Sequence, residues 1–424
     1  MPESLSILSL FLLGESPPAV TNAPASELLR YTLPPDKLAQ AYALYHIDVS
    51  LYFVTTLYLF FVLWLMLRTR FGARLRDFAE RASRFWLVRC TIVIAGVVLT
   101  MELLRLPFAI YRHHISLAYG LSVQQWGSWM SDWAKGLLLS LIVATLMGWL
   151  LYWLLRLSPR RWWFYYWLAT IPILLFSIFI YPILIDPLFN KFEPLTDNHA
   201  DLVEQIERVV HRAGMDIPPS RMFEMKASEK TTELNAYVTG FGSSKRVVVW
   251  DTTTQHLEIP ETLFVFGHEM GHYVLGHVMK GFVFAVAMML LLFYFSDRIG
   301  NWLLLRYGEA WHIRGLGDFA SIPLLILILY VLSFLGDPVS NAFSRHIEHE
   351  ADIYGLEVTH GLVPDSGRTA AHSFQVLGER SLDYPYVGKF AELWLWSHPT
   401  IADREVFAQT YDPWDEGEPP KFVK

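Results

Sequence analysis

The sequence predicts a mainly α-helical, multi-pass membrane protein with two polar regions outside its apolar runs. Hydrophobic side chains make up 53% of the 424 residues, and the mean hydropathy is +0.30. This is more apolar surface than one or two soluble domains bury. Six apolar runs approach the roughly 20 residues that a helix needs to cross a bilayer. They cover residues 49–67, 86–109, 134–156, 162–185, 279–296 and 319–336.

An N-terminal segment, residues 1–48, precedes the first of these runs. Its apolar stretch 5–14 is too short to span comfortably and lacks the basic flank of a secretory signal. We therefore expect an interfacial or buried segment there, with a cleaved signal as the less favoured alternative. The first four spans follow, within residues 49–185.

Two polar regions flank the last two spans, which lie within residues 279–336. The first, residues 186–278, has helical periodicity over 198–213 and a β-rich run over 245–250. The second, residues 337–411, leads into a tail, 412–424, whose proline and acidic content predicts a loose chain. Because two crossings return the chain to the same side of the membrane, both polar regions can contribute to one site.

The charge distribution argues against a nucleic-acid-binding protein, and the cysteine content excludes an intramolecular disulfide. The net charge of -7 is spread along the chain, and no basic patch indicates nucleic-acid binding. Cys90 is the single cysteine, so no intramolecular disulfide can form.

The first polar region ends in a metal-binding pattern, HEMGH, after a predicted helix start at Ile259-Pro260-Glu261. On a helix, His268 and His272 lie one turn apart on the same face, so both imidazoles can bind one zinc ion. Glu269 lies beside the first ligand, where its carboxylate can reach a water molecule on the metal. A chance occurrence on a solvated helix is the alternative, because short motifs have false positives.

His277 does not extend this pattern to a third ligand. Metalloproteases with three histidines need a glycine at position 275 and a histidine at position 278, whereas this chain has Leu275 and Val278. We therefore interpret His277 as a pocket or surface residue.

The third ligand is expected from the second polar region. Glu348 and Asp352 are i and i+4, so Glu348 can bind zinc while Asp352 accepts a hydrogen bond from the other nitrogen of a ligand histidine. His346 and His349 are rival ligands, but two histidines and one glutamate already leave the open fourth position that catalysis needs. Glu350 is expected to be a solvated charge.

Together these patterns resemble the type I CAAX prenyl endopeptidases, which are integral-membrane zinc metalloproteases of the gluzincin type. The resemblance runs from about residue 49 to residue 410. Besides the HEMGH stretch it rests on Ser344-Arg345-x-x-Glu348-x-x-Ala351-Asp352, Pro187 to Phe192, Asn235-Ala236-Tyr237 with Gly240, and His398-Pro399 followed by Arg404. Two departures are expected: the chain lacks the family's additional N-terminal span, and Thr400 stands where a second proline is typical.

The resemblance implies a polytopic α-helical barrel around a water-filled chamber, capped by a zincin-like domain with a small β-sheet. Glu102 and Arg105, on one face of the second span, independently favour a wet interior, because ionisable groups at that depth face a cavity or each other. A purely structural ion pair between helices is the alternative.

The resemblance also implies the roles of the metal-site residues. One Zn²⁺ per chain would be held by His268, His272 and Glu348, with Glu269 as the general base. Asp352 and Arg345 would lie around these ligands as supporting residues.

His398 or Arg404 is the candidate donor to the oxyanion by the same likeness. An equally supported role for both residues is to brace the zinc domain. A peptide would lie extended along Asn235, Ala236 and Tyr237, where main-chain pairing reads little sequence.

The leading function is zinc-dependent endoproteolysis of membrane-associated or hydrophobic-tailed polypeptides, either CAAX-protease-like or in membrane-protein quality control. A transporter or channel with a structural zinc domain is the alternative, but a structural site usually closes all four metal positions with protein ligands. An inactive scaffold would predict loss of Glu269, which is present. The expected partners are a peptide substrate and the lipid bilayer, and the sequence sets no oligomeric state.

Two arguments about the side of the membrane point in opposite directions, whether the membrane is a bacterial inner membrane or ER-like. Two short loops are rich in arginine: Arg68, Arg70, Arg74, Arg76, Arg81 and Arg84 after the first span, and Arg156, Arg160 and Arg161 after the third. The positive-inside rule places both loops in the cytoplasm and the site outside or in a lumen. The resembled family has its catalytic domain on the cytosolic side. We favour the charge count, because it comes from this chain.

Overall fold

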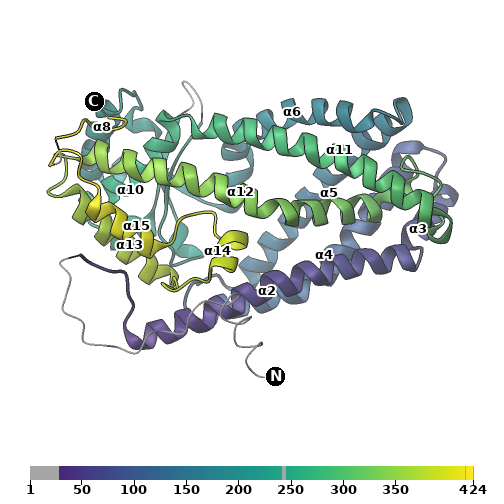
Figure 1. The fold of residues 1–424 in the computed structure, drawn as a ribbon, viewed down its shortest axis with the longest axis horizontal. Coiled ribbons are helices and arrows are strands. Elements are labelled where there is room, and N and C mark those ends of the chain that lie inside the picture. The colour runs from purple at the N-terminus through teal and green to yellow at the C-terminus, as the bar shows by residue number, and fades with distance from the viewer. Residues whose placement is uncertain (1–27, 241–244, 416, 424) are drawn as a thin grey trace.

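The computed structural model describes residues 28–240, 245–415 and 417–423. Figure 1 shows long helices that lie side by side and extend from a smaller mixed domain at one end of the molecule. The apolar stretch 5–14, for which an interfacial segment is expected, lies outside the described residues.

In the described part of the chain, six helices are long and apolar enough to cross a membrane. The first five contain one predicted apolar run each, and the sixth contains its run from residue 322, after the 3₁₀ turn Phe319–Ser321; this confirms the multi-pass prediction. They are α2 (Pro35–Arg68), α4 (Trp86–Ala118), α5 (Trp126–Leu157), α6 (Trp162–Ile180, continued by the π-helical turn Tyr181–Ile185), α11 (His277–Trp311) and α12 (Ile322–Thr359). The first helix begins at Pro35, inside the stretch that the sequence assigns to the N-terminal segment, because its polar first turns extend beyond the apolar run.

Two adjoining cavities lie along the membrane helices, the larger one between these helices and the smaller one between them and the mixed domain. They have volumes of about 810 Å³ and about 620 Å³, and both are lined by Tyr52, Arg112 and Asp337. Arg105 lines the larger cavity, which agrees with the wet interior expected from its position on the second span. The smaller cavity reaches His398. A chamber therefore continues from the membrane helices into the mixed domain.

The mixed domain contains a four-stranded sheet with the order β1-β2-β4-β3. Its strands are β1 (Phe192–Pro194), β2 (Met222–Met225), β3 (Ala236–Thr239) and β4 (Arg246–Trp250). β2 and β4 are parallel, and the other two pairs are antiparallel. β4 confirms the predicted strand over 245–250, and β3 lies at an edge of the sheet.

The remaining helices are short and belong mostly to the mixed domain. They are α3 (Phe71–Ala82), α7 (Asp186–Phe189), α8 (Ala200–Arg212), α9 (Asp251–His256), α10 (Ile259–Val274), α13 (Ser366–Ser381), α14 (Lys389–Leu395) and α15 (Ile401–Thr410). α8 confirms the predicted helix over 198–213, and Gly214 follows it with a φ of 66°. α13 and α15 pack together beside α10 and α12 (Figure 1). The two polar regions therefore meet in one domain, as the even number of crossings allows.

The end of the tail is anchored on α12. The backbone N–H groups of Phe422 and Val423 donate to Glu357 Oε2 at 2.7 and 2.8 Å, and that of Lys421 donates to Oε1. Glu357 is 1% exposed, so these bonds satisfy a buried carboxylate. Residues 421–423 are therefore held against α12, unlike the loose chain that the sequence predicts for the tail.

Candidate metal centre

α10 carries the two histidines in a rigid, buried setting. Pro260 lies in its first turn, and a capping box joins Glu258 and Glu261, whose Oε2 accepts from the Glu258 N–H at 2.8 Å. These devices fix the start of the helix. Phe264 and Phe266 are at most 1% exposed, so packing holds α10 in the domain core.

α12 carries the carboxylate. Its 38 residues span about 57 Å at 1.5 Å per residue, whereas the bilayer hydrocarbon is about 30 Å thick. The helix therefore projects well beyond the membrane, and Glu348 and Asp352 lie on this projecting part. A single helix thus connects the chamber wall to the metal site.

Glycines let the two helices approach closely. An added Cβ at Gly271 would lie 3.2 Å from the Ala351 Cα, and one at Gly267 would lie 3.4 Å from the Gly355 Cα. Both are contacts between α10 and the backbone of α12. The close approach brings the carboxylate of Glu348 to the histidines.

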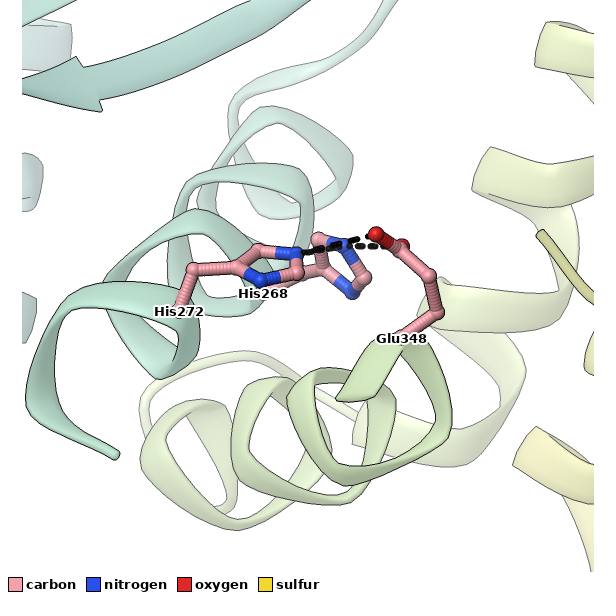
Figure 2. A group of neighbouring side chains, drawn as sticks. All are labelled: His268, His272 and Glu348. Atoms are coloured by element: carbon pink, nitrogen blue, oxygen red, sulfur yellow. Dashed lines mark hydrogen bonds and ion pairs between the residues drawn. The ribbon is translucent and has the colours of Figure 1, made fainter. Parts of the chain in front are cut away.

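Among the described residues, His268, His272 and Glu348 form the one group of three ligand-type side chains whose donor atoms all lie within 4.8 Å of one another. Figure 2 shows both imidazoles and the carboxylate pointing toward one another from two helices. The two Nε2 atoms are 3.1 Å apart. His268 Nε2 lies 3.3 Å from Glu348 Oε2, and His272 Nε2 lies 3.5 Å from Oε1.

These distances fit a tetrahedral metal ion. Ligands about 2.0–2.1 Å from a tetrahedral zinc lie about 3.3–3.4 Å from each other, close to the three separations in this site. Glu348 is 7% exposed, and its buried Oε2 has no hydrogen-bond partner. A buried carboxylate oxygen in that condition is costly without a positive partner, so the donor set suits a cation.

Asp352 orients His268. Its Oδ1 lies 2.8 Å from His268 Nδ1, which directs Nε2 toward the metal position. Arg404 holds Asp352 in turn through two donors, Nε to Oδ2 at 2.9 Å and Nη2 to Oδ1 at 2.7 Å. The Arg404 guanidinium also lies over the Phe374 ring, 4.4 Å from its centroid. The fork of Arg404 is thus engaged in support of the ligand.

Glu269 lies half-buried next to the ligands on α10. Burial raises the pKa of Glu269, while His268 and His272 act to lower it. A carboxylate with a raised pKa is a stronger base, which suits proton transfer. Within the described contacts it pairs with no cation, in keeping with a general base rather than a ligand.

His398 reaches the site from the loop before α15. Its Nε2 lies 3.4 Å from Glu348 Oε2, and its side chain is 55% exposed toward the cavity. Arg345 fixes this loop by donating to the carbonyl oxygens of Glu392 and Trp396 at 3.1 and 2.6 Å. The structure therefore brings the His398 imidazole next to Glu348 and places Arg345 against the segment that leads to His398.

The rival histidines lie away from the ligand atoms. His346 is 71% exposed and lies 4.0 Å from Glu350. The His349 ring packs against Phe407 with centroids 4.4 Å apart. Neither joins the ligand group.

The structure decides between the two alternatives for His277 and corrects the prediction for Glu350. His277 is 2% exposed, so it is a buried pocket residue and not a surface residue, and its Nδ1 lies 3.1 Å from His272 Nδ1. Glu350 is not a solvated charge: its side chain is 16% exposed and contacts His277 and Lys280. The spacing of five residues across a glycine was the available signal, since such a turn folds His277 back toward His272.

The predicted substrate residues lie on the edge strand and the turn before it. The Asn235 carbonyl accepts from the Trp250 N–H at 3.0 Å, Ala236 pairs with Val249, and the Tyr237 hydroxyl donates to Asp186 at 2.8 Å. β3 therefore uses one side for the sheet, and in the described structure no further strand pairs with its other side.

Comparison with known proteins also indicates a membrane metalloprotease. The description of peptidase family M48 matches residues 196–410, and that of a CAAX prenyl protease N-terminal domain with five membrane helices matches residues 21–191. A Bacillus subtilis protein named uncharacterized metalloprotease YhfN is 34% identical over 403 residues, covering 94% of this chain and 92% of that protein. The human CAAX prenyl protease 1 homolog is 24% identical over 381 residues, covering 79% and 76% of the two chains. The crystal structure of S. mikatae Ste24p has the same fold, with a TM-score of 0.75, 20% identity and 88% coverage of both chains.

Fold and site together define a multi-pass, membrane-embedded metalloendopeptidase. The chain belongs to peptidase family M48. The alternative of a transporter or channel finds no support in these relatives.

Proposed function

We propose that the protein is a zinc-dependent endopeptidase, with one zinc ion per chain, that cleaves membrane-associated or hydrophobic-tailed polypeptides inside its chamber. The observation that carries this proposal is the position of the ligand group. His398, which lies 3.4 Å from Glu348, also lines the cavity that adjoins the one between the membrane helices. A substrate held in the membrane can therefore reach the site without leaving the protein.

Glu269 transfers a proton in the proposed reaction, and His398 stabilises a developing negative charge. When bound, zinc supplies Lewis-acid polarisation of the scissile carbonyl. The Glu269 carboxylate takes the proton of the attacking water and passes it to the leaving amine. The imidazole of His398 donates a hydrogen bond to the carbonyl oxygen as negative charge develops on it.

Arg404 supports this chemistry as a positioning residue. Its two bonds to Asp352 leave little of its fork for a substrate oxygen, so we assign the oxyanion contact to His398. Arg345 serves His398 in a similar way by holding the carbonyl of Trp396, two residues before it.

The substrate is proposed to pair with the outer side of β3 and to extend a hydrophobic tail into the larger cavity. Main-chain pairing at a sheet edge accepts many sequences. Phe60, Phe108 and Phe334 line the larger cavity and offer apolar contacts to such a tail. The relatives named CAAX prenyl protease 1 homolog favour a lipidated tail within this class.

The test separates the base from the ligands. Glu269→Gln should keep about one zinc per chain but lose roughly a hundredfold or more of peptide hydrolysis, because the amide cannot accept the proton. Glu348→Ala should instead lose zinc itself. Hydrolysis that survives complete zinc removal would refute the proposal.

Substrate preference is measured with one peptide in two forms, with and without a prenyl group on the same cysteine. We expect the prenylated form to be cleaved with the lower KM. Equal kinetics for both forms would remove the tail from the proposal and leave general proteolysis of membrane-associated chains.

A further inference from the structure

The two zinc-site histidines have different outer partners. His268 Nδ1 faces a carboxylate directly, at 2.8 Å from Asp352. His272 Nδ1 faces another imidazole instead, at 3.1 Å from His277 Nδ1. The far nitrogen of His277, Nε2, lies 3.1 Å from Glu350 Oε2. Asp352 thus contacts the outer nitrogen of His268 directly, whereas Glu350 is connected to the outer nitrogen of His272 only through the His277 ring.

The hydrogen bonds from His272 through His277 to Glu350 have one consistent direction. Nε2 of His272 points to the ligand group, so its Nδ1 carries the proton and donates. His277 Nδ1 must then accept this hydrogen bond, so the proton of the His277 ring is on Nε2. The Nε2–H group donates a hydrogen bond to Glu350 Oε2. Lys280 Nζ lies 3.0 Å from the same Glu350 oxygen and favours the ionised carboxylate. Each group therefore fixes the tautomer of the next.

The backbone explains why His277 arrives at this position. Gly276 joins α10 to α11 with a φ of 69°, a left-handed conformation that favours glycine. The chain reverses there, and the first residue of α11 lies against the last turn of α10. Because His277 contacts Nδ1 of His272, on the side away from the ligand group, it cannot also serve as a ligand.

We propose that His277 and Glu350 are positioning residues that orient His272 for metal binding. The inference rests on the proposed zinc site. Outer partners of metal-bound histidines typically change metal affinity by about 10- to 100-fold when removed. We call the contacts His272–His277–Glu350 the relay. Glu350 lies two residues from Glu348, so the relay connects His272 on α10, through His277 on α11, to the helix that also carries Glu348.

The experiment measures zinc affinity of the full-length protein in detergent by competition with a chromogenic chelator. His277→Ala should weaken zinc binding about 10- to 100-fold. His277→Asn should recover part of this loss, because its side-chain oxygen can still accept from His272 Nδ1. His346→Ala is the matched control: it removes an exposed histidine 4.0 Å from Glu350 and should leave zinc affinity unchanged.

A second measurement reports on ligand orientation. The Co²⁺-substituted protein should show an altered visible absorption spectrum in His277→Ala and not in the control, because the ligand field depends on how His272 is held. Zinc affinity within about twofold of the parent protein, with an unaltered cobalt spectrum, would overturn the proposal.

Should His277→Ala fail to fold, Glu350→Ala decides, since it changes only the end of the relay. A loss of zinc affinity greater than twofold supports the relay, and a smaller change refutes it. Hydrolysis is not part of this test. A variant series that follows these expectations in a protein that cleaves no peptide would refute the proposed function and leave the relay standing.

Discussion

One methyl group at the α10–α12 contact tests whether helix spacing sets the metal site. A Cβ at Gly271 would lie 2.9 Å from the Tyr354 Cβ and 3.2 Å from the Ala351 Cα. Both atoms are fixed to the backbone of α12, so no side-chain rotation relieves the clash. Carbon atoms prefer separations of about 3.5–4.0 Å, so Gly271→Ala forces the helices apart by roughly 0.5 Å or more.

That displacement is large for a metal site. Metal–ligand distances tolerate about 0.2 Å, and the site depends on Glu348 from one helix facing His268 and His272 from the other. Overpacking of a tight contact costs about 1–3 kcal/mol. Where relaxation to the separated, metal-free arrangement recovers that energy, zinc affinity falls about 5- to 150-fold.

The assay is zinc affinity by chelator competition, with Gly281→Ala as the control. Gly281 lies in α11, and a Cβ there meets no described atom within 4 Å. The control adds the same methyl group to another helix without a clash. Equal zinc affinity in the two variants would refute the argument that the α10–α12 spacing limits the site.

Three further predictions concern other parts of the molecule. Arg404→Lys keeps the charge but loses the two-donor fork on Asp352, so zinc affinity should fall several-fold, up to about tenfold, while an unchanged affinity would show that charge alone suffices. Single cysteines at the exposed positions Ser220 and Ala82, in a background without the native cysteine, should react with an impermeant thiol reagent on intact cells at 220 and not at 82 if the arginine-rich loops are cytoplasmic; the reverse pattern supports a cytosolic site. Removal of residues 421–424 leaves the buried Glu357 without three donors, so thermal unfolding should occur several degrees lower, and an unchanged midpoint would show that the tail contributes no stability.

The structure reduces by one the number of arginines that contribute to the positive charge of the loop after the first span. Arg76 is 5% exposed and bonds to Asp318 and Asp77, so it contributes little to the charge of its loop. The other arginines of that loop keep the bias, and the labelling experiment therefore remains a fair test of the positive-inside argument.

Local sequence patterns determined the parts of this protein that depend on one segment at a time. Apolar length alone identified the six spans, because crossing a bilayer requires about 20 apolar residues wherever the helix packs. Helical spacing placed His268 and His272 on one face, since residues four apart always share a face. The choice of Glu348 over His346 and His349 followed from ligand chemistry together with the family resemblance, and the structure brings Glu348 alone of the three to the histidines.

Contacts between distant segments were decided only by the tertiary structure. The spacing of five residues across Gly276 could suggest that His277 lies near His272, but His277 and Glu350 are 73 residues apart, so no local pattern could show that these two side chains are in contact. The engagement of Arg404 with Asp352 likewise depends on how α15 packs against α12. A motif fixes which residue types share a helix face, but the partner that satisfies the second nitrogen of each histidine is set by helix packing, because burial forces every polar atom there to find a neighbour from another part of the chain.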